Sequence, residues 1–156
     1  ATMKRLVFFY ILATVVFASH HGFAANTIGA GFILGSPSGL TAKIFMLQND
    51  AIDIGIGESS DDLYMYADYL RHFSNIFPVK NLAFYVGAGV GFHDYEKDGR
   101  NDHEDENRVE IRTPLGLEYA FTEVPIRIFF ELVPALRIAP DVDFGVRGGL
   151  GARYFF

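Results

Sequence analysis

Residues 126–133 read IRIFFELV, and apolar side chains at 126, 128, 130 and 132 alternate there with Arg127, Phe129, Glu131 and Val133. Alternation with a period of two residues is typical of a β-strand whose two faces meet different surroundings. One face of this segment is uniformly apolar, while the other mixes charges with bulky apolar groups. The stretch therefore predicts a strand that separates an apolar environment from a partly polar one.

Seven further segments on either side of this stretch alternate in the same way. Turn-forming clusters such as Ser36-Pro37-Ser38-Gly39 and Ala139-Pro140-Asp141 separate them. Past residue 24, no apolar run approaches the length of a membrane helix. The eight predicted strands are about 26–34, 39–47, 51–58, 62–73, 82–93, 108–120, 125–136 and 143–156.

The charges on the alternating face come in equal numbers of each sign. In a soluble sandwich this face would lie in water, but here it carries isolated charges among glycines and aromatic residues. Opposite charges confined in a lumen would pair, because an unpaired buried charge is costly. The predicted lumen charge network comprises Lys43, Asp53, Asp68, Glu110, Arg112, Glu118, Arg127, Glu131, Arg147 and Arg153.

These patterns predict an all-β fold, a closed eight-stranded antiparallel transmembrane β-barrel with a side-chain-filled polar lumen. Eight strands leave room for side chains but not for a continuous channel, so an open pore through one barrel is not expected. An even strand count places both chain ends on one side. With those ends in the periplasm, the long connection 94–107 faces outward.

The N-terminus has the features of a secretory signal peptide. Lys4 and Arg5 follow Met3, and an apolar run from Leu6 to Ala18 comes next. Gly22-Phe23-Ala24 then matches the small-x-small pattern of a signal-peptide cleavage site. Residues 1–24 are therefore expected to be a signal peptide, with Ala1 and Thr2 ahead of the natural start, and residues 25–156 the barrel. The alternative is a signal anchor that is retained.

The composition excludes several classes of function. The net charge is −6, and loss of residues 1–24 would remove two cations and leave the remainder still more acidic. No basic stripe exists to neutralise phosphates, which excludes a nucleic-acid role. The absence of cysteine excludes thiolate catalysis and cysteine metal sites. No cofactor is predicted.

The C-terminus, residues 150–156 (LGARYFF), resembles the terminal strand of outer-membrane barrels, which ends in phenylalanine after alternating apolar residues. This resemblance implies outer-membrane localisation and recognition by the outer-membrane insertion machinery, with Leu150, Ala152, Tyr154 and Phe156 as the assembly signal. Residues 26–156 look like the small OmpA/OmpX-type barrels, and most of all like the porin-like small barrels of predatory bacteria and spirochaetes. The segments that carry this likeness are 35–43, 67–70, 112–117 and 130–134.

The segment His72-Phe73-Ser74-Asn75 resembles the His-x-Ser-Asn element of outer-membrane lipid A deacylases. This resemblance implies a hydrolase with Ser74 as nucleophile, His72 as its base and Glu123 or Asp68 as the acid that orients the base. The simpler interpretation is a turn in which Ser74 and Asn75 cap a strand. The predicted topology puts this turn at the periplasmic end, whereas lipid A occupies the outer leaflet.

The connection 94–107 is rich in carboxylates, and Asp102, Glu104, Asp105 and Glu106 are weak candidates for a divalent-cation site. The spacing does not match an EF-hand loop, and a solvated loop is the alternative interpretation. No other metal site is predicted.

Small residues occupy outward positions where large lipid-facing side chains are expected. Small residues let protein surfaces approach closely within lipid, so two such patches on different walls favour a homo-oligomer, even a ring that encloses lipid. The alternative is a monomer in which these residues serve strand curvature. The small patch comprises Ala30, Ala42, Ala67, Ala88, Gly148 and Ala152.

Two functions follow from the sequence. The first is a non-enzymatic barrel with a structural, envelope-organising role, whose partners are membrane lipids, lipopolysaccharide and further copies of itself. The second is a lipid A-modifying hydrolase centred on Ser74 and His72.

Overall fold

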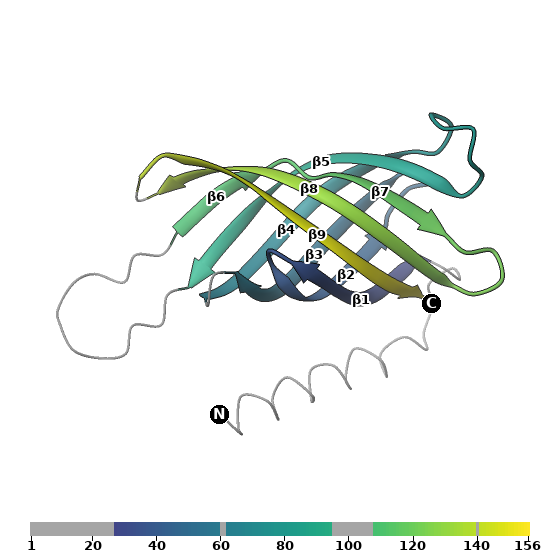
Figure 1. Cartoon of the computed structure of the whole chain (residues 1–156), viewed down its shortest axis with the longest axis horizontal. Helices are drawn as coiled ribbons and strands as arrows, with labels where there is room; N and C mark the ends of the chain where they lie inside the picture. The colour runs from purple at the N-terminus through teal and green to yellow at the C-terminus, as the bar shows by residue number, and fades with distance from the viewer. Residues whose placement is uncertain (1–26, 60–61, 95–107, 140) are drawn as a thin grey trace, which may run out of the picture.

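The computed structural model describes residues 27–59, 62–94, 108–139 and 141–156, and all of its regular structure is antiparallel β-sheet. Its nine strands wrap obliquely around one long axis (Figure 1). They are β1 (Ile28–Gly35), β2 (Ser38–Phe45), β3 (Asp50–Ser59), β4 (Asp62–Phe73), β5 (Leu82–Asp94), β6 (Arg108–Arg112), β7 (Leu115–Ala120), β8 (Ile126–Ala139) and β9 (Asp143–Phe155). The prediction of an all-β antiparallel fold is confirmed. Within the described residues, no helix is long and apolar enough to cross a membrane.

The strand pairings run in a ring. Each strand from β1 to β5 pairs with the next, β8 pairs with β9, and β9 returns to β1 from Gly29 opposite Phe155 to Gly35 opposite Gly149. Both β6 and β7 pair with β5 on one side and with β8 on the other. Hydrogen bonds between the strands therefore continue around the whole sheet.

The structure differs from the prediction of eight strands at residues 108–120, where Thr113 and Pro114 divide one predicted strand into β6 and β7. Proline has no N–H to donate to a ladder. The register with β5 and β8 nevertheless continues across the break, since the Gly87 N–H donates to the Pro114 carbonyl and the Thr113 N–H to the Pro134 carbonyl. The two strands thus share one position in the ring.

The two ends of the ring differ. The end on the right of Figure 1, here called the terminal end, is where β1 begins and β9 finishes. It also holds the turns 46–49, 74–81 and 121–125. At the opposite, distal end lie the tip of the β1–β2 hairpin and the start of β9. This arrangement follows from antiparallel pairing of consecutive strands, which places successive connections at opposite ends.

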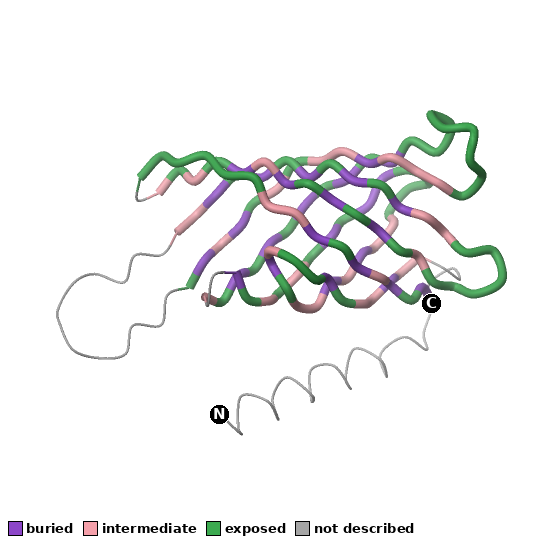
Figure 2. Tube along the Cα trace, in the orientation of Figure 1, coloured by how far each residue is buried: buried purple, intermediate pink, exposed green. Residues whose placement is uncertain are grey.

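Buried and exposed residues alternate along the strands (Figure 2). In β4, for example, Tyr64, Tyr66, Asp68, Leu70 and His72 are buried, and the residues between them are exposed. Inward glycines make room for these side chains: a Cβ on Gly116 would meet the Tyr85 ring. The interior is therefore filled by large polar and aromatic side chains, and the exposed face of the strands is apolar.

Candidate functional site

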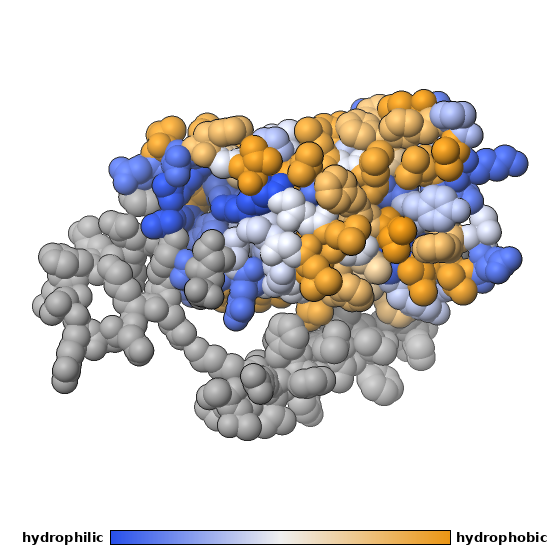
Figure 3. All heavy atoms as spheres, viewed as in Figure 1, coloured by the Kyte–Doolittle hydropathy of each residue, from blue (hydrophilic) through white to orange (hydrophobic). Residues whose placement is uncertain are grey.

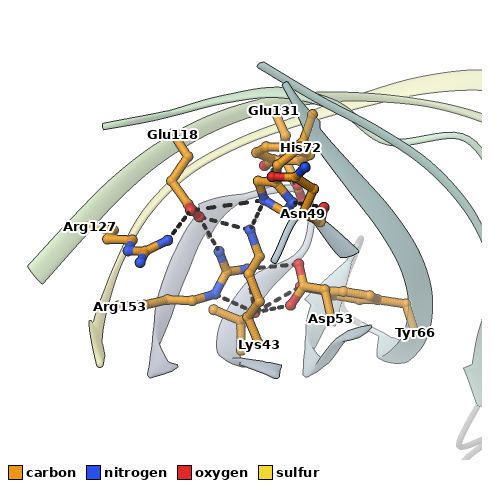
Figure 4. Close-up of polar contacts among 11 residues, drawn as sticks. Lys43, Asn49, Asp53, Tyr66, His72, Glu118, Arg127, Glu131 and Arg153 are labelled. Carbon is orange, nitrogen blue, oxygen red and sulfur yellow. Dashed lines mark hydrogen bonds and ion pairs between the residues drawn. The ribbon is translucent and has the colours of Figure 1, made fainter. Parts of the chain in front are cut away.

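The interior polar side chains form two connected clusters, of which Figure 4 draws the first. It lies toward the terminal end, where β2 and β7 finish. Its centre is Glu118 on β7, which pairs with Lys43 of β2 at 2.7 Å and with Arg127 of β8 at 3.2 Å. Arg153 of β9 lies 3.8 Å from the same carboxylate. One carboxylate thus joins side chains from strands on different walls of the ring.

Arg153 also connects this cluster to β3. Its Nη2 lies 2.8 Å from Asp53 Oδ2 and donates to the Thr41 hydroxyl at 2.8 Å, while that hydroxyl donates to Asp53 Oδ1 at 2.9 Å. The guanidinium carbon lies 3.8 Å from the centroid of the Phe129 ring. Arg153 and Asp53 are almost fully buried, so this pair is shielded from solvent and from salt.

The second cluster lies toward the distal end and centres on Glu110 of β6. Arg147 of β9 pairs with both carboxylate oxygens, and the Tyr64 hydroxyl donates to the same group. Arg112 donates to the Tyr64 hydroxyl at 2.7 Å, and its Nε lies 2.9 Å from Asp68 Oδ1. The Tyr64 hydroxyl therefore joins the Glu110 carboxylate to the Arg112 guanidinium across the interior.

Glu131 connects the two clusters. It lies 4.0 Å from Arg112 of the second cluster and accepts a hydrogen bond of 2.8 Å from Tyr85, whose ring centroid lies 4.5 Å from Lys43 Nζ of the first. The structure thus brings all ten charged side chains of the proposed network into the interior, each within 4.0 Å of an opposite charge. Because most of these pairs join strands that are not neighbours, the network braces the ring and fills it.

His72 does not form the arrangement that a hydrolase would need. Its Nε2 lies 3.2 Å from Lys43 Nζ, and its Nδ1 lies 3.3 Å from the Asn49 carbonyl oxygen. Ser74 and Glu123 are exposed on two different turns, and no hydrogen bond joins either of them to His72 in the described chain. Asp68 contacts Arg112 instead. The hydrolase alternative is not supported.

The residues of the small patch all lie on outward positions. Ala30 and Ala42 are direct cross-strand neighbours on β1 and β2, and Ala152 lies close by on β9 opposite Phe32. Ala67 lies on β4 and Ala88 on the neighbouring β5. Gly148 lies on β9, opposite Leu132 of β8. The structure therefore groups three of the six, Ala30, Ala42 and Ala152, around the β1–β9 junction and two more on a separate wall.

The proposed assembly signal is a regular part of β9. Leu150, Ala152 and Tyr154 point outward, and the Phe156 N–H donates to the Ile28 carbonyl at 2.8 Å just beyond the strand. The C-terminal strand is thereby fixed against β1.

Several predicted features lie outside the described residues. These are the signal peptide, residues 1–24, and the acidic candidates for a cation site, Asp102, Glu104, Asp105 and Glu106. In the parts of the chain that the structure describes, no group of three or more suitable side chains could hold a metal ion.

Sequence reasoning missed His93, Tyr64 and Thr41 as members of the network. His93 Nε2 lies 3.0 Å from Arg147 Nη2 and 3.6 Å from Glu110. Thr41 and Tyr64 lie on the same inward face as Lys43 and Asp68 of their own strands, and His93 lies on the same inward face of β5 as the buried Tyr85. The alternation along each strand could have identified these three side chains as inward. They were missed because only carboxylates, lysines and arginines were counted on that face.

Comparisons with known proteins agree with this architecture. The model of a family described as "Protein of unknown function (DUF3996)" matches residues 20–143. The search of curated proteins found no match. Among solved structures, the N-terminal β-barrel domain of OprF from Pseudomonas aeruginosa is similar, with a TM-score of 0.68 and 19% sequence identity over 85% of this chain and 98% of that domain. At this identity the likeness shows the fold alone, which is that of a β-barrel.

Proposed function

The chain belongs to the DUF3996 family, and we propose that it is a non-enzymatic integral protein of the outer membrane, a closed barrel of eight strand positions that organises the envelope. The barrel likeness to the OprF domain supports this location. In this proposal residues 1–24 direct export, and the outer-membrane insertion machinery recognises the C-terminal strand. Lipids and lipopolysaccharide surround the finished barrel.

The apolar outer surface is the observation that carries this proposal. Large apolar side chains are exposed at outward positions of every strand except β2, as for Phe130 at 49% and Leu150 at 57%. Figure 3 shows such residues gathered over the half of one face that lies toward the terminal end, on the right, with hydrophilic residues at both ends. A continuous apolar surface of this kind would be costly in water, while lipid tails would cover it at no such cost.

The limits of this surface resemble those of membrane barrels. Near the terminal end, outward Tyr69, Tyr119 and Tyr154 lie where a ring of aromatic residues meets the lipid headgroups in such barrels. Near the distal end, Glu58 and Asp94 take outward positions. Lipid would therefore contact the middle of the strands.

The filled interior supports a structural role over that of a pore. Its charges are paired across the ring, and large side chains such as Tyr66 and Phe129 are buried among them. A ring of eight strand positions has space for these groups and no continuous aqueous path beside them.

Tryptophan fluorescence can test the membrane proposal, because the chain contains no tryptophan. We expect Phe130→Trp, in the middle of β8 and outward, to be strongly quenched by lipids that carry bromine or nitroxide groups on their acyl chains. The physical reason is direct contact between the indole ring and the acyl chains. The measurement uses full-length protein refolded into vesicles.

Val142→Trp is the matched control, since Val142 is an exposed apolar residue (77%) in the distal β8–β9 connection. This variant should stay accessible to a water-soluble quencher and respond little to the lipid quenchers. Equal lipid quenching of the two variants, or none at position 130, would overturn the proposal.

We also propose that the barrel forms a homo-oligomer through its small outward residues, with lipid enclosed if the contacts close into a ring. Ala30, Ala42 and Ala152 would let a neighbouring barrel approach closely, and the separate pair Ala67 and Ala88 offers a second contact. Two different patches produce head-to-tail contacts, which can close into rings.

Native mass spectrometry of protein extracted from membranes tests this assembly. We expect a single multiple of the protomer mass, and Ala42→Leu should convert it to monomer because the larger side chain separates the two surfaces. Ile54→Leu, at the outward position opposite Ala42 on β3, is the control. A monomer in the unsubstituted protein would exclude the oligomer.

A further inference from the structure

At the distal end, the interior opens into a pocket of about 200 Å³. Three guanidinium groups line it, Arg108 from β6, Arg137 from β8 and Arg147 from β9, together with His93 and the hydroxyls of Ser36 and Ser59. The volume is sufficient for a tetrahedral oxyanion with part of the molecule that bears it. All of the side chains named here can donate hydrogen bonds.

Two carboxylates also line the pocket, and they differ in how firmly they are held. Glu110 is buried and already accepts hydrogen bonds from Arg147 and Tyr64. Asp143 is 66% exposed and contacts only Arg137 in the described chain, through a single oxygen at 3.0 Å. An exposed pair of this kind contributes little free energy, so a better acceptor can replace Asp143.

Arg137 has donors to spare. Its Nη2 donates to Asp143, and its Nε is buried and makes no hydrogen bond with any described residue. A guanidinium has five N–H donors in a planar fork that fits two oxygens of a phosphate at once. The single carboxylate oxygen of Asp143 accepts from only one of these donors. A phosphate group would accept hydrogen bonds from two of them at once.

We propose that this pocket binds a phosphate group, with Arg137 contacting two of its oxygens after Asp143 has moved aside. Arg147 stays paired with Glu110 and adds to the positive potential. The Ser36 and Ser59 hydroxyls hydrogen-bond to each other at 3.0 Å, which leaves one of the two O–H groups to donate to a further phosphate oxygen. Either a lipid headgroup or a free phosphorylated small molecule carries this chemistry. The inference does not depend on the membrane proposal, since the pocket is formed by inward side chains at the end of the ring.

Isothermal titration of the refolded full-length protein in a non-ionic detergent, with inorganic phosphate as the probe, tests the proposal. Arg137→Gln should weaken binding by at least about tenfold, because two charge-assisted hydrogen bonds are lost. Asp143→Asn should tighten binding by about threefold or more, because the competing negative charge is removed. The opposite directions of the two effects exclude a general loss of fold as their cause.

Arg71→Gln is the matched control for Arg137→Gln, because each substitution removes one positive charge. Arg71 pairs with Asp50 at 2.8 Å near the terminal end, on the outer face, so phosphate binding should be unchanged. Absence of phosphate binding, or the same affinity in the Arg137 and Asp143 variants as in the unsubstituted protein, would overturn the proposal.

A second titration distinguishes the two sources of phosphate. Micelles doped with phosphatidic acid present a lipid phosphomonoester, and glycerol 3-phosphate presents the same group in solution. Tighter binding of the doped micelles identifies a lipid headgroup, and equal or weaker binding identifies a soluble ligand. Either result must show the same dependence on Arg137, or the proposal fails.

Discussion

We expect Glu118→Gln to lower the free energy of unfolding of the refolded barrel by about 3–5 kcal/mol. The substitution keeps the shape of the side chain but removes the one carboxylate that lies near Lys43, Arg127 and Arg153. Lys43 and Arg153 are buried, so their charges would then lack this counter-charge in a region of low dielectric constant. Urea-induced unfolding of the protein in lipid vesicles measures the change.

Glu123→Gln is the matched control, since Glu123 is exposed on the turn between β7 and β8. Its effect should stay within about 0.5 kcal/mol. The double variant with Lys43→Met should lose less stability than the sum of the two single variants, because the two side chains are coupled. Equal effects of the two glutamate substitutions would contradict the bracing role of the network.

Gly31→Ala should destabilise the barrel by about 3 kcal/mol, at the upper end of the usual range for overpacking. A Cβ on Gly31 would collide with the carbonyl oxygen of Ala152 on the paired strand β9. Backbone cannot rotate away as a side chain can, so the β1–β9 pairing itself must shift. The same urea unfolding experiment measures this loss, and the fraction that refolds should also fall.

Gly145→Ala makes the same chemical change where no atom lies within 4 Å of the added Cβ. This variant should be as stable as the unsubstituted protein or slightly more so, since alanine restricts the unfolded chain. A loss in the Gly145 variant as large as that in the Gly31 variant would show that the close approach of β1 and β9 is unimportant.

The strands could be predicted from the sequence because each has one face toward the interior of the ring and one toward the outside. The hydropathy of the residues therefore alternates with a period of two along every strand. The segment 62–73 coincides with β4, and 82–93 with β5 to within one residue. The break at Thr113 and Pro114 was not predicted, since apolar and polar residues alternate straight through it. Proline removes a hydrogen bond without changing that alternation, so hydropathy carries no sign of the break.

The candidate site was predictable only in part. Parity along each strand indicates which side chains share a face, and it assigned Lys43 and Glu118 to the interior face. It does not indicate that these two meet, since β2 and β7 are not neighbours and their contact depends on the stagger between all the strands in the ring. The distal pocket depends on the same stagger, which sets how far β8 and β9 extend past β1.

The pairing of β1 with β9 has a consequence for when this protein can fold. Gly29 lies opposite Phe155, so the ladder that completes the ring joins residues from nearly opposite ends of the described chain. Such contacts of high sequence separation form late and slowly. Closure has to wait until β9 has been synthesised, and until the two strands meet both β1 and β9 present unpaired edges that invite aggregation. We therefore expect this topology to depend on protection of those two edges until the ring closes.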